Sequence, residues 1–160
     1  MRRQPQYVPG GAPIGLVADL DRPAATAVCY LRLWRDGPEA RARLWNALAS
    51  GLGLEDGRRV MSTFEDLVNL CARHGRRPLA CHGVNCRCLG ADEACFAQFI
   101  TTATEGDRED AMLIAILLVR PDVAPLIAAL AADFGHALKR MHLCETPVAP
   151  RRPAVSPTLH

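Results

Sequence analysis

Cysteine and histidine side chains gather in one short stretch of this chain. Of its twelve Cys and His residues, seven fall within the 25 positions from Cys71 to Cys95. An even scatter would place about two of them there. Thiolates and imidazoles are ligands that zinc prefers, and four of them usually surround the ion tetrahedrally. The clustering therefore predicts a metal site, and its candidate ligands are Cys71, His74, Cys81, His82, Cys86, Cys88 and Cys95.

Three cysteines in a predicted loop, Cys81, Cys86 and Cys88, are the strongest part of this pattern. Loops lie at the protein surface, and an exposed thiol is open to oxidation unless something holds it. A fourth ligand could be Cys95, because the positive end of a helix favours a thiolate, or it could be a histidine. We therefore expect these residues to bind a structural zinc ion.

The cysteines outside the loop have a simpler interpretation. Cys71 and His74 are three residues apart in a predicted helix and share one of its faces, which suits a pair of metal ligands. However, Cys71 and Cys95 both fall on apolar helical stripes, and cysteine is among the residue types most often buried. We therefore interpret Cys71, Cys95 and Cys29 as core residues. For Cys71 and Cys95, metal binding is the second interpretation.

Other functions of the cluster stay open. Plant-type iron–sulfur proteins use a C-x4-C-x2-C pattern, whereas only one residue separates Cys86 from Cys88. A thiol-based redox sensor or redox enzyme would instead join Cys86 to Cys88, or one of them to Cys81, in a disulfide. A nucleophilic pair of Cys81 and His74 is a further option. Finally, the thiols could be incidental to a bare interaction module.

The cysteine-rich loop is also basic. Residues 69–91 contain four arginines and no acidic residue, so this segment carries +4 and the rest of the chain −2, for a net charge of +2. Positive neighbours lower the pKa of a thiol and would offset the negative charge of a zinc–thiolate centre. Because no aromatic residue is interleaved with these arginines, the pattern does not favour nucleic-acid binding. We expect the loop to present a basic surface to a protein partner.

Helical periodicity runs through the middle of the chain, and no alternation typical of strands is visible. The length of 160 residues and the 49% hydrophobic content support one domain with a sizeable core. Asp21, Asp92 and Asp107 mark helix starts, as does a capping box at Ser62 and Glu65. The sequence predicts an all-α, single-domain bundle of about six helices, with the cysteine-rich loop between the third and fourth. Their approximate ranges are 21–37, 38–51, 62–75, 92–106, 107–121 and 122–144.

The fifth predicted helix contains the longest apolar run, nine residues from Ala111 to Val119. A helix that is apolar nearly all round belongs at the centre of a bundle, although it could also form the face of a homo-oligomer. The run is far shorter than the roughly 20 residues of a membrane span. The sixth helix has the cleanest apolar stripe, which begins with Val123 and Leu126 and ends at Met141.

The ends of the chain are rich in proline. We expect an irregular arm at 1–20, a helical domain at 21–144 and a disordered tail at 145–160. No signal peptide is recognisable, which favours the cytoplasm, where thiols stay reduced. Phosphate-binding loops, nucleophile elbows and metalloprotease motifs are missing from the sequence. We therefore expect a non-enzymatic regulatory or protein-interaction module.

Overall fold

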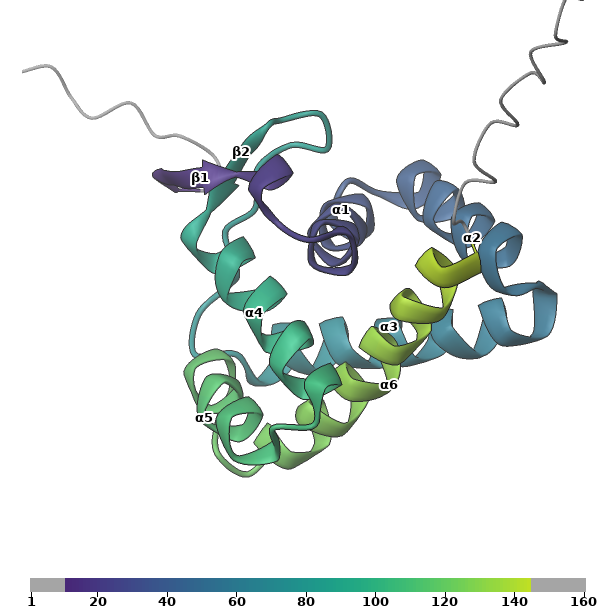
Figure 1. Cartoon of the computed structure of the whole chain (residues 1–160). Coiled ribbons are helices and arrows are strands. Elements are labelled where there is room, and N and C mark those ends of the chain that lie inside the picture. The colour runs from purple at the N-terminus through teal and green to yellow at the C-terminus, as the bar shows by residue number, and fades with distance from the viewer. Residues whose placement is uncertain (1–10, 145–160) are drawn as a thin grey trace, which may run out of the picture.

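The computed structural model describes residues 11–144, which form six α-helices around an apolar core (Figure 1). The predicted all-α bundle is confirmed. Residues 11–20 of the predicted N-terminal arm are described, whereas residues 1–10 and the predicted tail at 145–160 lie outside the described residues. The helices are α1 (Arg22–Arg35), α2 (Pro38–Leu52), α3 (Leu54–His74), α4 (Ala91–Glu105), α5 (Arg108–Leu118) and α6 (Ala124–Cys144).

The core is centred on α6, which packs against each of the other five helices. Phe64 on α3 and Phe134 on α6 have ring centroids 4.8 Å apart, and Trp34 on α1 meets Phe64 edge-on at 6.0 Å. Both phenylalanines are fully buried. Because burying one such side chain contributes roughly 1.5–3 kcal/mol, this aromatic cluster links α1, α3 and α6 firmly.

Two of the predicted capping side chains, Asp21 and Asp107, act as the sequence predicts. An oxygen of Asp21 accepts a hydrogen bond from the backbone N–H of Ala24 at 2.9 Å, at the start of α1. Asp107 does the same for Asp110 at 3.1 Å, at the start of α5. Each cap satisfies a backbone donor that the first helical turn leaves free.

The segment 51–57, which follows the second predicted helix and precedes the third, is almost entirely helical. The break between α2 and α3 is the single residue Gly53, whose φ of +84° suits glycine. The predicted start at Ser62 is therefore wrong, since Ser62 lies inside α3. Gly57 is a packing residue, because a Cβ atom there would lie 3.1 Å from the Cα atom of Ala49. A glycine thus marks a close helix crossing as well as a turn.

The predicted central position of the fifth helix is wrong. The α5 helix lies at the edge of the bundle and packs mainly against α4 and α6 (Figure 1). Leu113 and Leu117 on its outer face are 64% and 67% exposed, and Leu126 of the predicted α6 stripe is also exposed. No helix among the described residues is long and apolar enough to cross a membrane.

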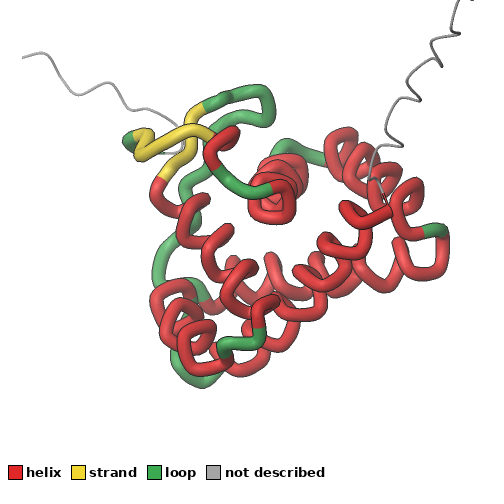
Figure 2. The backbone as a smooth tube through the Cα atoms, in the orientation of Figure 1, coloured by secondary structure: helices red, strands yellow, loops and turns green. Residues whose placement is uncertain are grey.

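A small sheet, which the sequence analysis did not predict, joins the N-terminal segment to the cysteine-rich loop (Figure 2). Strand β1 (Pro13–Leu16) pairs antiparallel with β2 (Cys88–Gly90), and a short 3-10 helix, η1 (Val17–Asp19), follows β1. These strands are too short to show an alternating pattern. Their pairing fixes the end of the loop at the start of α4.

Candidate functional site

The cysteine-rich loop, residues 75–90, is held in place by an ion pair buried beneath it. Arg32 on α1 donates from Nε and Nη2 to the carboxylate of Glu93 on α4, at 2.7 and 2.8 Å. Both side chains are at most 1% exposed. Two parallel hydrogen bonds between guanidinium and carboxylate combine strength with a defined orientation. This pair connects two helices directly below the loop.

The rest of the Arg32 guanidinium binds backbone carbonyl groups of the loop. Nη1 donates to Cys86 O at 2.6 Å and to Gly83 O at 3.2 Å, and Nη2 donates to Cys88 O at 2.6 Å. Together with the two bonds to Glu93, these contacts match the donor capacity of a guanidinium, which has five N–H groups. Arg32 therefore shapes the segment that contains two of the predicted metal ligands.

The carboxylate of Glu93, like the guanidinium of Arg32, has hydrogen-bond partners on all sides. Its carboxylate also accepts hydrogen bonds from the backbone N–H groups of His82 and Gly90, each at 3.0 Å. Burial works to raise the pKa of Glu93, but the hydrogen bonds from Arg32, Gly90 and His82 together hold that pKa below its usual value. The residue is thus a buried, ionised anchor for both ends of the segment 82–90.

A second ion pair holds the start of the loop. Both terminal nitrogens of Arg77 donate to the carboxylate of Asp92, which also accepts from the backbone N–H of Ala80 at 2.7 Å. The hydrogen bond from Arg77 is the main reason that the pKa of Asp92 is lowered. Asp92 is therefore not the predicted N-cap, because α4 begins at Ala91 and the Asp92 side chain turns back to the loop.

Two predicted ligands lie on helices, with thiols that ionise reluctantly. Cys71 is buried in the core, and burial raises its pKa to about 12. Cys95 is half-buried on α4, where burial and the charge of Asp92 raise its pKa. Both positions fit the packing interpretation of the apolar stripes.

The surrounding arginines do not lower the pKa of Cys81 or Cys88 below the usual value of a thiol. Burial raises the pKa of Cys81, although Arg35 Nη1 lies 3.9 Å from its sulfur and opposes the shift. A hydrogen bond with Cys86 raises the pKa of Cys88. The expected lowering of thiol pKa by basic neighbours is therefore wrong for Cys81 and Cys88. The physical reason is that burial of Cys81 and the neighbouring Cys86 side chain at Cys88 outweigh the lowering effect of Arg35 and Arg32.

The two histidines of the cluster have different surroundings. His74 Nδ1 lies 3.3 Å from Arg120 Nη2, beside the turn between α5 and α6. His82 is buried, and its Nε2 atom has no hydrogen-bond partner among the described residues. All seven predicted ligands lie among the described residues 11–144. In these residues no group of three His, Cys, Asp or Glu side chains is placed to hold a metal ion. Zinc binding and iron–sulfur binding stay predictions from the sequence.

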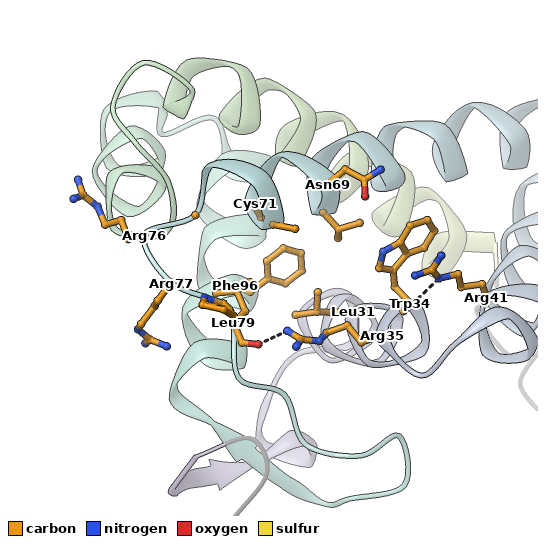
Figure 3. A pocket seen from close by; sticks show the side chains of 14 residues that line it. Leu31, Trp34, Arg35, Arg41, Asn69, Cys71, Arg76, Arg77, Leu79 and Phe96 are labelled. Carbon is orange, nitrogen blue, oxygen red and sulfur yellow. Dashed lines mark hydrogen bonds between the residues drawn. The ribbon is translucent and has the colours of Figure 1, made fainter.

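A pocket of about 620 Å³ lies between α1 and α3 (Figure 3). Helix α1 packs mainly against α4 and α2, and α3 packs mainly against α2 and α6, so a space remains between the backbones of α1 and α3 beside the contact of Trp34 with Phe64. The cysteine-rich loop closes one end of this space, and Trp34 lies at the other (Figure 3). The lining residues are Leu31, Trp34, Arg35, Arg41, Val68, Asn69, Cys71, Ala72, Gly75, Arg76, Arg77, Pro78, Leu79 and Phe96.

The α1–α3 pocket combines apolar walls with a basic opening. Leu31 and Phe96 face the space between the helices (Figure 3). Arg35 Nη1 donates to the carbonyl oxygen of Leu79. Arg41 Nε donates to Trp34 O at 2.8 Å, and its guanidinium lies 4.1 Å from the Trp34 ring centroid. No Asp or Glu occurs among the described residues that line the pocket.

Two further arginines of the lining are directed elsewhere. The guanidinium groups of Arg76 and Arg77 point away from the pocket (Figure 3). Arg76 Nε donates to Ile116 O at 2.6 Å, and Arg77 is paired with Asp92. Arg35 and Arg41, in contrast, make no ion pair with a described acidic residue. They are therefore the two cations available to a bound molecule.

Arg32 and Glu93 were not predicted as site residues from the sequence. One signal was present, because Arg32 follows Val28 by four residues and so shares the buried face of the first helix. A second was the acidic pair Asp92 and Glu93, directly after a loop without acidic residues. Neither signal points to the α1–α3 pocket, which exists only because two helices stand apart.

Comparison with known proteins adds no further assignment. No protein-family model, no curated protein and no solved structure matches this chain.

Proposed function

We propose that this protein is a non-enzymatic binding module whose α1–α3 pocket takes a small organic anion with an apolar body. The observation that carries the proposal is an apolar pocket with two unpaired arginines and no acidic side chain in its described lining. Its volume of about 620 Å³ lies within the range of roughly 300–1,000 Å³ that is typical of small-molecule sites.

The apolar part of the ligand would lie against side chains that the core already fixes. Trp34 and Leu79 are partly exposed in the pocket, and behind them Leu31, Val68 and Phe96 are each at least 94% buried, so little ordering is needed when a ligand arrives. A preformed wall of this kind lowers the entropic cost of binding. Removing apolar ligand surface from water then contributes roughly 25 cal/mol per Å².

The charged part of the ligand would meet Arg35 and Arg41 at the opening. Each guanidinium uses a donor to bind a backbone carbonyl and keeps other N–H groups available. Guanidinium groups match carboxylate, sulfonate and phosphate oxygens through paired hydrogen bonds. The backbone contacts also restrain both side chains beside the pocket, which favours a charged ligand over a neutral one of the same shape.

The proposal retains the regulatory module expected from the sequence, with a small anion as the ligand. Pro78 and Leu79 of the cysteine-rich loop form part of the pocket wall. A bound ligand would therefore touch the same loop whose other end is fixed by Arg32 and Glu93. This contact supports a role in which ligand binding stabilises the loop in its described conformation.

The test uses 8-anilinonaphthalene-1-sulfonate, a fluorescent probe with an aromatic body and one negative charge. We expect one saturable site, and weaker binding of the uncharged analogue N-phenyl-1-naphthylamine. Losing one exposed guanidinium contact costs about 1 kcal/mol, so Arg35→Gln and Arg41→Gln should each weaken sulfonate binding about fivefold. The matched control is Arg59→Gln on α3, because Arg59 is exposed and pairs with Asp56 outside the pocket.

A second variant tests the apolar wall. Val68→Phe adds bulk inside the pocket and should weaken binding of both the charged and the uncharged probe. Thermal unfolding and circular dichroism of each variant would establish that the fold is retained. Folded Val68→Phe and Arg41→Gln proteins that bind both probes as the unchanged protein does would refute the proposal.

A further inference from the structure

The outer face of α5 is apolar and largely uncovered by the rest of the described chain (Figure 1). Ala111 and Ala115 are buried where α5 packs against α4 and α6. Leu113 and Leu117 are one helical turn apart on the opposite side, where 64% and 67% of their surface is exposed. Ile116 beside them is half-buried. We call Leu113, Ile116 and Leu117 the α5 outer face, and a contiguous apolar strip of this kind is typical of an interaction site.

The N-terminal end of α5 is acidic. Residues 105–110 contain four carboxylates and one arginine, for a net charge of −3. Asp110 is three residues before Leu113 and seven before Leu117, so it shares their side of the helix. The negative charge of nearby Asp107 is the main reason that the pKa of Asp110 is raised. A positive group beside Asp110 would therefore relieve a repulsion within the chain.

The C-terminal end of α5 is basic. Arg76 donates from Nε to the carbonyl oxygen of Ile116 at 2.6 Å, and Arg120 lies two residues beyond the last residue of the helix. Arg120 pairs with Asp122 at 3.2 Å, yet 59% of its side chain is exposed. The two arginines and Asp122 give this end a net charge of +1. The α5 outer face therefore lies between a negative end and a positive end.

We propose that the α5 outer face binds the same face of a second copy of this chain, with the two α5 helices antiparallel. In such a symmetric pair the same residues lie on both sides of a twofold axis. An axis level with residue 115 places Leu113 of each copy opposite Leu117 of the other, and Asp110 opposite Arg120. A parallel pair would instead bring like charges together. This inference does not rest on the α1–α3 pocket.

The size of the face sets the strength of the expected dimer. A stable interface usually buries about 800 Å² on each partner. The α5 helix has 11 residues and is therefore only about 16 Å long. One face of such a helix is smaller than a standard interface, so we expect a reversible dimer whose fraction rises with protein concentration.

Sedimentation velocity of the full chain measures this association, in reducing buffer so that the exposed Cys144 cannot link two copies. We expect the mass to rise from monomer to dimer between about 1 μM and 1 mM. Leu113→Ser and Leu117→Ser should each weaken the dimer at least about tenfold, because each substitution occurs twice in a symmetric pair. The matched control is Leu54→Ser, since Leu54 is 69% exposed at the start of α3 and only the other end of α3 approaches α5.

A charge exchange tests the antiparallel arrangement. Asp110→Arg alone and Arg120→Asp alone each place like charges opposite one another, so each variant should stay monomeric where the unchanged protein is dimeric. An equimolar mixture of the two variants restores opposite charges at both contacts and should associate again, as should the double variant. The matched control is Glu65→Arg, an exposed position on α3. Circular dichroism of every variant establishes that the fold is retained.

Three results would overturn the proposal. The first is a monomer at every concentration, which would leave the α5 outer face to a different partner or to another part of this chain. The second is a dimer that folded Leu113→Ser and Leu117→Ser proteins form as readily as the unchanged protein, because another surface would then hold the copies together. The third is a mixture of Asp110→Arg and Arg120→Asp proteins that stays monomeric, which would exclude the antiparallel pairing.

Discussion

Replacing Glu93 by glutamine tests whether the buried ion pair holds the fold together. The two carboxylate oxygens accept four hydrogen bonds, from Arg32 Nε, Arg32 Nη2, His82 N and Gly90 N. Glutamine keeps the shape but offers one oxygen and an NH2 group. With the oxygen in the place of Oε1, the donors on Arg32 Nη2 and Gly90 would face another donor. The buried guanidinium would also lose its counter-charge.

The expected loss of stability follows from the lost hydrogen bonds and the lost negative charge of Glu93. Breaking a buried ion pair by removing one partner costs about 3–5 kcal/mol, because the remaining charge is left uncompensated. At roughly 3–4 °C per kcal/mol for a domain of this size, Glu93→Gln should lower Tm by about 10–20 °C. The matched control is Glu65→Gln on α3, where the side chain is exposed and the change should stay within about 0.5 kcal/mol.

Urea unfolding would measure the free energy of unfolding for Glu93→Gln, Arg32→Met and the double variant. Arg32→Met should cost much less stability in the Glu93→Gln protein than in the unchanged protein. The reason is that the Glu93 charge, which Arg32→Met would otherwise leave unpaired, is already absent. We expect a coupling energy of about 2 kcal/mol or more between the two positions. A loss below 1 kcal/mol in Glu93→Gln, or additive losses in the double variant, would show that the pair does not anchor the loop.

The other predictions concern pH and metal removal. Since the folded-state pKa values of Asp92 and Glu93 lie below their usual 3.8 and 4.5, these groups stabilise the fold above about pH 4.5 and lose that contribution as the pH falls through the folded values. The difference in urea midpoint between the unchanged protein and Glu93→Gln should therefore shrink from pH 6 to pH 3, and a constant difference would contradict this assignment. Because ion pairs hold the loop, a chelator should leave Tm unchanged in protein purified without a metal-binding tag. About one zinc per chain, with a fall in Tm on its removal, would instead support the zinc hypothesis drawn from the sequence.

Interactions between near neighbours could be predicted from the sequence. The caps at Asp21 and Asp107 were predicted correctly because a cap joins a side chain to a backbone group three residues away. The predicted end of the third helix near residue 75 is also correct, since α3 ends at His74 and Gly75 adopts an extended conformation. Predictions failed where a local signal has two meanings. A glycine can end a helix, as Gly53 does, or admit a neighbouring helix, as Gly57 does.

By itself, the sequence determined the number of helices, most of their ends and the position of a basic, cysteine-rich loop between the third and fourth. Only the tertiary structure decided what holds that loop, because Arg32 and Glu93 are 61 residues apart in the chain. It also decided that α5 lies at the edge of the bundle and that α1 and α3 leave a pocket between them. Periodicity shows which face of a helix is apolar. Which faces meet, and which charges become buried together, depends on the packing of all six helices of the described chain.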